Sequence, residues 1–359
     1  MRRVIPLLVV IVMLFSACGG DTPPPPVPTN TPAPTKEAAE PEEKATPKSG
    51  SDGANLSDEE LAEKMRPAVV RILAQFAESA ISPEGLGAGS GVVYDLENGY
   101  IATNAHVVEG ASIIKVALAG SDKTRSARVL GRSQCDDLAV IKVDNTSGME
   151  EAVLGDSDKM KVGASVMALG YPESFDLGND LTVTTGNISK LNTQRDKLED
   201  VIQMTAFVTH GNSGGPLVNQ KGEVIGINTR IFYTSSGERE PGINFAVSMS
   251  HAKPIIEQLQ EGMNRHYIGL NLYPNLFADY FGTDEGMAVV GVASGSPASG
   301  VGIEAADLLL KLEGTSVADE TDVCNILRSH ADGDQLSVQL YRKATDEVLE
   351  GELTMGEEK

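Results

Sequence analysis

The sequence predicts an all-β domain followed by a smaller α+β domain, with an export signal and a spacer in front of both. Between residues 68 and 247, short apolar, β-branched segments alternate with turn residues, a pattern typical of a barrel or a sandwich. Residues 266–355 mix strands with a helix, as small α+β modules do. The 359 residues suffice for two such domains plus unstructured material.

The N-terminus has the order of an export signal. Arg2 and Arg3 precede an apolar run over residues 4–15 that is too short to span a bilayer comfortably, and small residues then lead to Cys18. Residues 15–18 also resemble a bacterial lipobox, with Phe15 in place of the usual leucine. We expect removal of residues 1–17 and acylation of Cys18, which would anchor the protein to a membrane outside the cytoplasm. Ordinary cleavage without acylation is the alternative.

Residues 18–55 are rich in Pro, Thr, Ala, Glu and Lys, and include a run of four prolines at 23–26. Such a segment cannot bury enough apolar surface to offset its ordering entropy, so we expect a disordered linker. Ser57 and Glu60 have the spacing of a capping box, which predicts a short helix ending at Met65. The first folded domain therefore begins near residue 56.

Several elements can be placed within the two domains. A helix predicted over residues 253–261, with Pro254 in its first turn and Gly262 as its stop, closes a first domain of residues 56–262. The second domain covers residues 263–359 and includes a predicted helix over 320–330. Strands are predicted at residues 68–73, 90–94, 138–143, 223–227 and 287–292.

Charge and cysteine content exclude some classes of function. The net charge of −22 and the absence of a long basic run argue against a nucleic-acid partner. Cys135 and Cys324 fall in different predicted domains, so a disulfide would require an interdomain contact with Cα atoms within about 7 Å. We favour two buried free thiols, and neither cysteine has the paired spacing of a metal site.

Three residues in chain order carry the pattern of nucleophilic catalysis. Ser213 lies in the Gly-rich stretch 211–217, which suits a tight turn with an exposed hydroxyl and free backbone N–H groups. His106 follows an apolar strand and can exchange a proton near neutral pH. Asp137 precedes another apolar strand, where its carboxylate can accept the imidazole N–H. The order His, Asp, Ser is that of the chymotrypsin arrangement.

The sequence resembles the HtrA/DegP serine proteases from about residue 56 to 355, and the motifs that carry the resemblance lie at 89–93, 103–108, 137–142, 211–217 and 242–247. The resemblance implies an all-β chymotrypsin-like double β-barrel protease domain followed by a small α+β PDZ domain. It further implies a homotrimer that needs no metal or organic cofactor. The expected activity is endopeptidase cleavage of unfolded or damaged proteins outside the cytoplasm.

Carried over to this chain, the family motif makes His106 the general base, Asp137 the orienting carboxylate and Ser213 the nucleophile. The oxyanion hole would be formed at Gly211, Asn212 and Ser213, through the backbone N–H groups of the first and third. Substrate backbone would bind along a strand containing Ile243, Asn244, Phe245 and Ala246. Thr209-His210 stands where the family has Asn-Pro, which leaves the resting conformation of the oxyanion loop open.

The second domain contains a stretch that resembles the PDZ loop for a peptide's terminal carboxylate, made of Tyr267, Ile268, Gly269 and Leu270. A strand edge after this loop would pair with the peptide. A PDZ domain acting only as a spacer is the alternative for this part of the chain. For the whole protein, the alternative is a non-proteolytic chaperone or scaffold lipoprotein that binds extended peptides. The complete set of three catalytic groups favours the protease.

Overall fold

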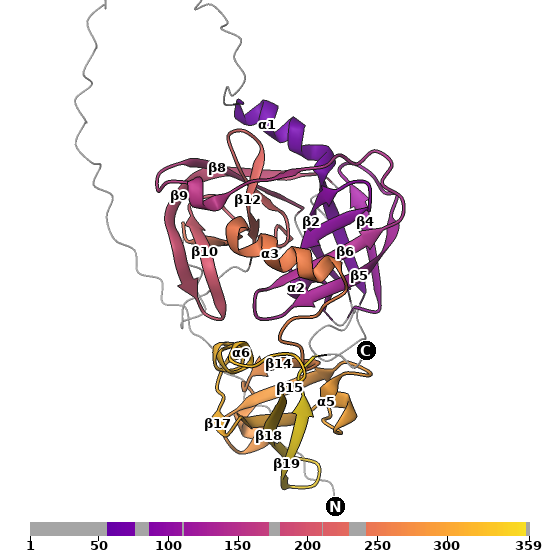
Figure 1. Cartoon of the computed structure of the whole chain (residues 1–359), viewed down its shortest axis with the longest axis vertical. Helices are drawn as coiled ribbons and strands as arrows, with labels where there is room; N and C mark the ends of the chain where they lie inside the picture. The colour runs from indigo at the N-terminus through magenta and orange to yellow at the C-terminus, as the bar shows by residue number, and fades with distance from the viewer. Residues whose placement is uncertain are drawn as a thin grey trace, which may run out of the picture. The chain divides into compact units, whose positions relative to one another are not determined.

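The computed structural model describes residues 56–75, 86–109, 111–171, 180–209, 211–229 and 242–356 (Figure 1). The chain divides into two units, residues 1–50 and 51–359, and every described element belongs to the second. The predicted signal, Cys18, the linker to residue 55 and His210 all lie outside the described residues. In the described part of the chain, no helix is both long and apolar enough to cross a bilayer.

The first six strands form a closed barrel in the order β1-β2-β3-β6-β5-β4. Their alternating β-branched residues fill its interior, among them Ile72, Ile101 and Ile141. The strands predicted at 68–73, 90–94 and 138–143 are confirmed within this barrel. Its members are β1 (Val69–Gln75), β2 (Leu86–Asp95), β3 (Tyr100–Thr103), β4 (Ile113–Leu118), β5 (Arg125–Ser133) and β6 (Leu138–Val143).

The next strands form a second barrel. The sheet order is β11-β8-β9-β10-β13-β12-β7, and a further pairing of β11 with β12 closes six of these strands into a ring. The short β7 is added at the outside, parallel to β12. The predicted double barrel is thus confirmed, and its second half consists of β7 (Val153–Leu154), β8 (Ser165–Gly170), β9 (Thr182–Arg195), β10 (Leu198–Met204), β11 (Pro216–Asn219), β12 (Glu223–Asn228) and β13 (Asn244–Ser248).

Helix α3 (Met249–Gln260) packs against β5 and β6 of the first barrel and β12 of the second (Figure 1). It begins earlier than predicted, because the hydroxyl of Ser248 accepts a hydrogen bond from the His251 N–H and caps the helix. Pro254 therefore lies inside the helix and not in its first turn. The other helical segments of this domain are α1 (Asp58–Met65), with the predicted capping box, η1 (Arg66–Ala68), α2 (Ala105–Val108) and η2 (Ser157–Lys159).

The C-terminal domain has a sheet in the order β14-β15-β16-β18-β19, with β17 paired to β16. Strand β14 is therefore an edge strand, and α6 packs against it. The helix predicted over 320–330 is confirmed but ends at Arg328. The elements are β14 (Leu270–Pro274), α4 (Ala278–Phe281), β15 (Met287–Val292), α5 (Pro297–Gly300), β16 (Asp307–Leu312), β17 (Thr315–Ser316), α6 (Glu320–Arg328), β18 (Gln335–Arg342) and β19 (Glu347–Thr354).

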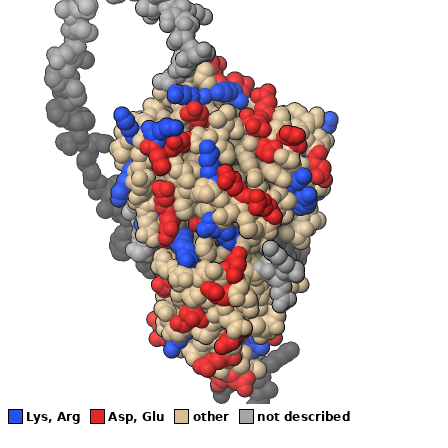
Figure 2. All heavy atoms as spheres, in the orientation of Figure 1, with Lys and Arg blue, Asp and Glu red and all other residues tan. Residues whose placement is uncertain are grey.

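The two remaining cysteines are joined, which corrects the expectation of free thiols. Cys135 and Cys324 form a disulfide with their Cα atoms 5.4 Å apart. The sequence could not reveal this, because the 189 residues between them are brought together only by contacts between the two domains. On the face drawn in Figure 2, acidic and basic side chains are interspersed and no continuous basic surface is present.

Candidate active site

The structure brings His106 and Asp137 into direct contact. His106 lies in α2, directly after β3, and Asp137 lies in the turn between β5 and β6, which pairs with β3. His106 Nδ1 is 2.9 Å from each oxygen of the Asp137 carboxylate, and the His106 backbone N–H also donates to that carboxylate. The Asp137 side chain is 2% exposed and the His106 side chain 27%, so the acid is enclosed while the imidazole reaches the surface.

The position of Asp137 is held by neighbours from both barrels. Its backbone has a positive φ of 52°, which an aspartate tolerates better than most residues. The Asn104 side-chain amide donates to its carbonyl oxygen, and the Thr229 hydroxyl donates to its Oδ2 at 2.7 Å. No sequence pattern pointed to Thr229, since a threonine after an apolar strand carries no functional signal of its own.

Ser213 lies on a tight turn before β11 that is fastened to the first barrel. The Ser90 N–H donates to the Ser213 carbonyl oxygen at 2.8 Å, and the Ser90 hydroxyl donates to the Gly211 carbonyl oxygen at 2.6 Å. Gly214 has a φ of 85°, and a Cβ there would collide with the Ser90 carbonyl and the Thr103 hydroxyl. The turn therefore lies against the segment that leads to His106.

Gly89 lies where the turn of Ser213 meets the helix that carries His106. A Cβ at Gly89 would lie 2.6 Å from the Val107 side chain and 3.3 Å from the Ser213 carbonyl oxygen, so this glycine lets the two segments approach. Within the described residues, the Ser213 hydroxyl makes no hydrogen bond with the His106 ring. Catalytic hydrogen bonds are often long in unliganded enzymes and shorten when substrate binds.

The residues expected to form the oxyanion hole lie in a turn, whereas most of those expected to bind substrate lie buried in a strand. Gly211 has a φ of 96°, while the Asn212 N–H donates to the Thr209 carbonyl oxygen. Asn244, Phe245 and Ala246 are buried in β13, which pairs with β10 along this whole stretch and with β12 from Ala246 onward. Ile243, directly before β13, is only partly buried, so it is the most exposed of these four residues.

A second buried carboxylate, Asp136, lies beside Asp137 in the turn between β5 and β6, and no sequence pattern pointed to it. Its oxygens accept hydrogen bonds from the Ser133 hydroxyl at 2.5 Å and from His251 Nε2 at 3.1 Å, with Arg328 and Arg265 at 3.7 and 4.0 Å. Burial alone would raise the pKa of Asp136, but the hydrogen bonds from His251 and Ser133 and the charge of Arg265 lower it below its ordinary value. The carboxylate is therefore ionised at neutral pH.

A cavity of about 170 Å³ adjoins His106 and Asp137, and residues of both domains line it. His106, Asp137 and Lys197 lie on the side of the protease domain, and β14 and Glu320 contribute the other wall. The ammonium of Lys197 is 3.0 Å from the Glu320 carboxylate. Burial also raises the pKa of Glu109 in this wall, against the lowering effect of Arg132 and Lys197.

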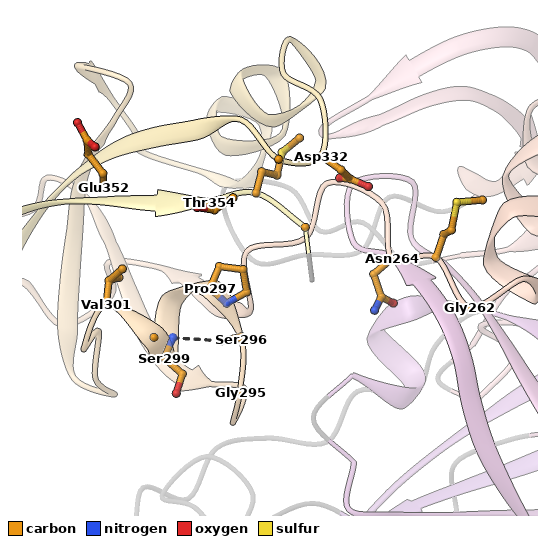
Figure 3. Close-up of a pocket in the computed structure, with 15 residues that line it drawn as sticks. Gly262, Asn264, Gly295, Ser296, Pro297, Ser299, Val301, Asp332, Glu352 and Thr354 are labelled. Carbon is orange, nitrogen blue, oxygen red and sulfur yellow. Dashed lines mark hydrogen bonds between the residues drawn. The ribbon is translucent and has the colours of Figure 1, made fainter. Parts of the chain in front are cut away.

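A larger cavity of about 770 Å³ has neither His106 nor Asp137 in its lining. It lies between Gly262 and Asn264, which follow α3, and the segment around α5 (Figure 3). Asp332 and Glu352 are its charged lining residues, and Ser296 caps α5 by accepting from the Ser299 N–H. It contains none of the expected site residues. In the described part of the chain, no group of three or more His, Cys, Asp or Glu is placed to hold a metal ion.

Comparison with known proteins identifies the family. A model of the trypsin-like peptidase domain matches residues 89–227, and a model of the PDZ domain matches residues 247–353. The serine protease Do-like HtrA of Bacillus subtilis is 34% identical over 344 residues, covering 86% of this chain and 74% of that protein. The chain belongs to the HtrA/DegP family of serine proteases. It is a serine endopeptidase with a trypsin-like domain and a PDZ domain.

Other members of the HtrA/DegP family show the same relationship. A DegP-like periplasmic serine endoprotease of Halomonas elongata is 36% identical, with 73% of this chain and 55% of that protein covered. The solved structure of the HtrA-type protease AlgW with a tripeptide superposes with a TM-score of 0.52 at 28% identity, covering 84% of this chain and 98% of that one. The predicted fold class and enzyme class are thus confirmed, and a non-proteolytic scaffold is not favoured.

Proposed function

We propose that this endopeptidase works by acyl-enzyme catalysis with Ser213 as nucleophile, His106 as general base and Asp137 as the orienting carboxylate. The observation that carries the proposal is the contact of His106 Nδ1 with both oxygens of buried Asp137. This contact favours the neutral tautomer with the proton on Nδ1, so Nε2 is the nitrogen that can accept the serine proton. The carboxylate then stabilises the imidazolium that forms during attack.

The tetrahedral intermediate would place its oxyanion at the 211–213 turn. The backbone N–H groups of Gly211 and Ser213 would donate to it, with Asn212 between them holding the turn through its bond to Thr209. His106 would next donate its proton to the leaving amine, and a water molecule would hydrolyse the ester on Ser213. Substrate backbone would approach along Ile243 and the start of β13.

The substrates we propose are unfolded or damaged proteins outside the cytoplasm. Support comes from the periplasmic location named for relatives from Halomonas elongata and Rhizobium meliloti, and from the export signal predicted at residues 1–17. Extended, unfolded chains are the form of protein that can lie along an active-site strand. The PDZ loop at Tyr267, Ile268, Gly269 and Leu270 would recruit such substrates by their C-termini.

The anchoring and assembly of the protein are further parts of the proposal. Residues 1–17 would be removed, Cys18 acylated and residues 18–55 left as a spacer, so that the domains at 56–262 and 263–359 stand away from the membrane. We propose a homotrimer, as the resemblance to the family implies. Mass spectrometry of the mature N-terminus and sedimentation analysis test these two points.

The decisive experiment compares casein cleavage by the full chain with cleavage by Ser213→Ala. In another triad protease, loss of the serine costs roughly 10⁶ in turnover, so cleavage should vanish. Ser294→Ala, at an exposed serine of the PDZ domain, is the matched control and should cleave like the parent. Cleavage of casein by Ser213→Ala at the parent rate would refute the assignment of the nucleophile.

A further inference from the structure

The disulfide between Cys135 and Cys324 connects the turn that carries Asp137 to the peptide groove of the PDZ domain. Cys135 stands two residues before Asp137, and Cys324 lies in the middle of α6. We propose that the protein's own segment 134–135 fills the PDZ groove, that the disulfide locks it there, and that reduction by a dithiol opens the groove to external peptide C-termini. This inference rests on the proposed role of the groove in recruitment.

The groove is defined by an edge strand and a helix. Strand β14 pairs with β15 on one side, no other described strand pairs with its second side, and α6 packs along it. A peptide that adds a strand to such an edge bonds to its free backbone groups and places a side chain between the strand and the helix. The apolar floor is formed by buried residues of both elements and of the loop before β14, namely Ile268, Leu270, Leu272, Val323 and Leu327.

Segment 134–135 occupies this place in the structure. The side-chain amide of Gln134 donates to the Leu270 carbonyl oxygen, a backbone group at the start of β14. Cys135 is 1% exposed and belongs to the buried cluster of the PDZ domain, although the chain around it belongs to the protease domain. Arg328 of α6 donates to the Cys135 carbonyl oxygen at 2.9 Å. Both walls of the groove thus contact this segment.

The residues before this segment guide it toward the groove. Ser133 forms a parallel β-bridge with Arg265, and the Arg265 N–H donates to the Arg132 carbonyl oxygen. The Arg132 guanidinium lies 4.8 Å above the Tyr267 ring and donates to its hydroxyl at 2.9 Å. Tyr267 begins the loop expected to capture a carboxylate. A peptide C-terminus would therefore meet Arg132, Gln134 and Cys135 where its last residues should bind.

The opening reaction is a thiol–disulfide exchange. A thiolate of the dithiol attacks one sulfur, the S–S bond breaks, and a mixed disulfide forms while the other cysteine leaves as a thiolate that takes up a proton. The second thiol of the reductant then closes its own disulfide and releases the remaining cysteine. Two electrons pass to the protein and the dithiol is oxidised. Both cysteines are buried, so the reductant reaches them when α6 opens locally.

The first test measures whether the disulfide is formed and whether its reduction loosens β14 and α6. We use the full chain with Cys18→Ser and Ser213→Ala, so that Cys135 and Cys324 are the remaining thiols and no probe is cleaved. Alkylation without reductant should leave both cysteines unmodified. Reduction with dithiothreitol should then increase amide hydrogen exchange in β14 and α6. Alkylation of both cysteines before reduction, or unchanged exchange after it, would overturn the proposal.

The second test asks what enters the opened groove. The probe is a pool of random ten-residue peptides with free C-terminal carboxylates, and the same pool with amidated C-termini is the control. The reduced protein should retain at least about tenfold more of the carboxylate pool than the oxidised protein, because a locked groove has almost no binding-competent fraction. Additional Cys135→Ser and Cys324→Ser changes should give high retention with or without reductant.

The outcomes separate this inference from the proposed function. Equal retention by the oxidised and reduced proteins would show that the segment does not block the groove and would overturn the lock. No retention in either state, with exchange increased, would overturn peptide recruitment by the groove and the inference with it. Casein cleavage by the chain with Ser213 intact remains an independent result, since the binding assays involve no cleavage.

Discussion

Thr229 links the second barrel to Asp137, the proposed orienting carboxylate in the first. Its hydroxyl donates to Asp137 Oδ2 at 2.7 Å. The backbone N–H and the imidazole Nδ1 of His106 bond the same carboxylate. A buried carboxylate that lacks one of its donors costs free energy, because water cannot reach the group to replace the missing hydrogen bond. Thr229 is therefore a positioning residue that acts through Asp137.

Replacing Thr229 by Val should lower kcat/KM without unfolding the protein. A hydrogen bond to a charged group contributes about 1.5–3 kcal/mol, which corresponds to a loss of roughly 10- to 100-fold. Cleavage of a fluorescent peptide and a circular dichroism spectrum measure the two properties. Thr229→Ser keeps the hydroxyl and should recover most of the activity. A Val variant with the activity of the parent would show that this bond does not hold Asp137.

Asp136 should make the domain contact sensitive to acid. Its pKa is lowered in the folded protein by His251 and Ser133 and by Arg265, with Arg328 also nearby. A carboxylate with a lowered folded pKa stabilises the fold above its unfolded pKa of about 3.9, and that contribution is lost as the pH falls below this value. The difference in Tm between the parent and Asp136→Asn should therefore narrow from pH 5 to pH 3. A difference that widens over this range would contradict the argument.

Helix α3 contacts both barrels and also the turn between β5 and β6 that carries Asp136 and Asp137. Its apolar face buries Ala252, Ile255, Ile256 and Leu259, and its N-terminal turn carries His251, which bonds Asp136. Pro254 lies inside the helix and removes one interior N–H donor. The burial of the apolar face keeps the chain helical despite this loss. The cap at Ser248 thus supports both the helix and the position of His251.

Replacing Ser248 by Ala should destabilise the protease domain by about 1 kcal/mol, within the range of roughly 0.5–2 kcal/mol known for N-caps. The His251 N–H would lose its acceptor in a partly buried place, which agrees with a value in this range. Calorimetric unfolding measures the effect. Ser57→Ala, at the exposed cap of α1, is the comparison, and its hydroxyl accepts from the Glu60 N–H. A larger loss at Ser57 than at Ser248 would refute the structural role of α3.

At the scale of the whole molecule, Arg328 joins the PDZ domain to two loops of the protease domain. Its guanidinium donates to the carbonyl oxygens of Cys135 and Lys197, and it is 13% exposed. Asp136 and Glu199 supply negative charge beside it. The cation therefore contacts both barrels from a PDZ helix, independently of the disulfide.

Replacing Arg328 by Met should loosen this contact most clearly in the reduced protein, because the disulfide still joins the domains in the oxidised form. Loss of the donor leaves two carbonyl groups without a partner, a cost of about 1–3 kcal/mol each when they stay buried. Hydrogen exchange in residues 132–137 should rise after reduction, compared with Arg128→Met at an exposed position of β5. The same exchange in both variants would show that Arg328 does not hold the turn.

The sequence by itself predicted β-strands in a barrel or sandwich, a small α+β module and the three residues of the expected triad. These predictions depend on local patterns, since β-branched alternation predicts strands and short Gly-rich or apolar motifs surround Ser213, His106 and Asp137. The double barrel and the PDZ domain followed from the resemblance of such motifs to the HtrA/DegP family. Even α6 and the capping box of α1 followed from spacing alone. The start of α3 did not, because the apolar face of a helix outweighs a proline that usually marks a first turn.

Only the tertiary structure decided how the domains are connected. Cys135 and Cys324 are 189 residues apart, and the sequence interpretation favoured free thiols because nothing local pairs them. Thr229 and Arg328 likewise act on residues more than 90 positions away along the chain. Such contacts arise when barrels, helix and sheet pack together, and their energies depend on distances that no single segment encodes. The expected triad could be predicted from motifs, whereas the residues that hold Asp137 in place depended on the fold.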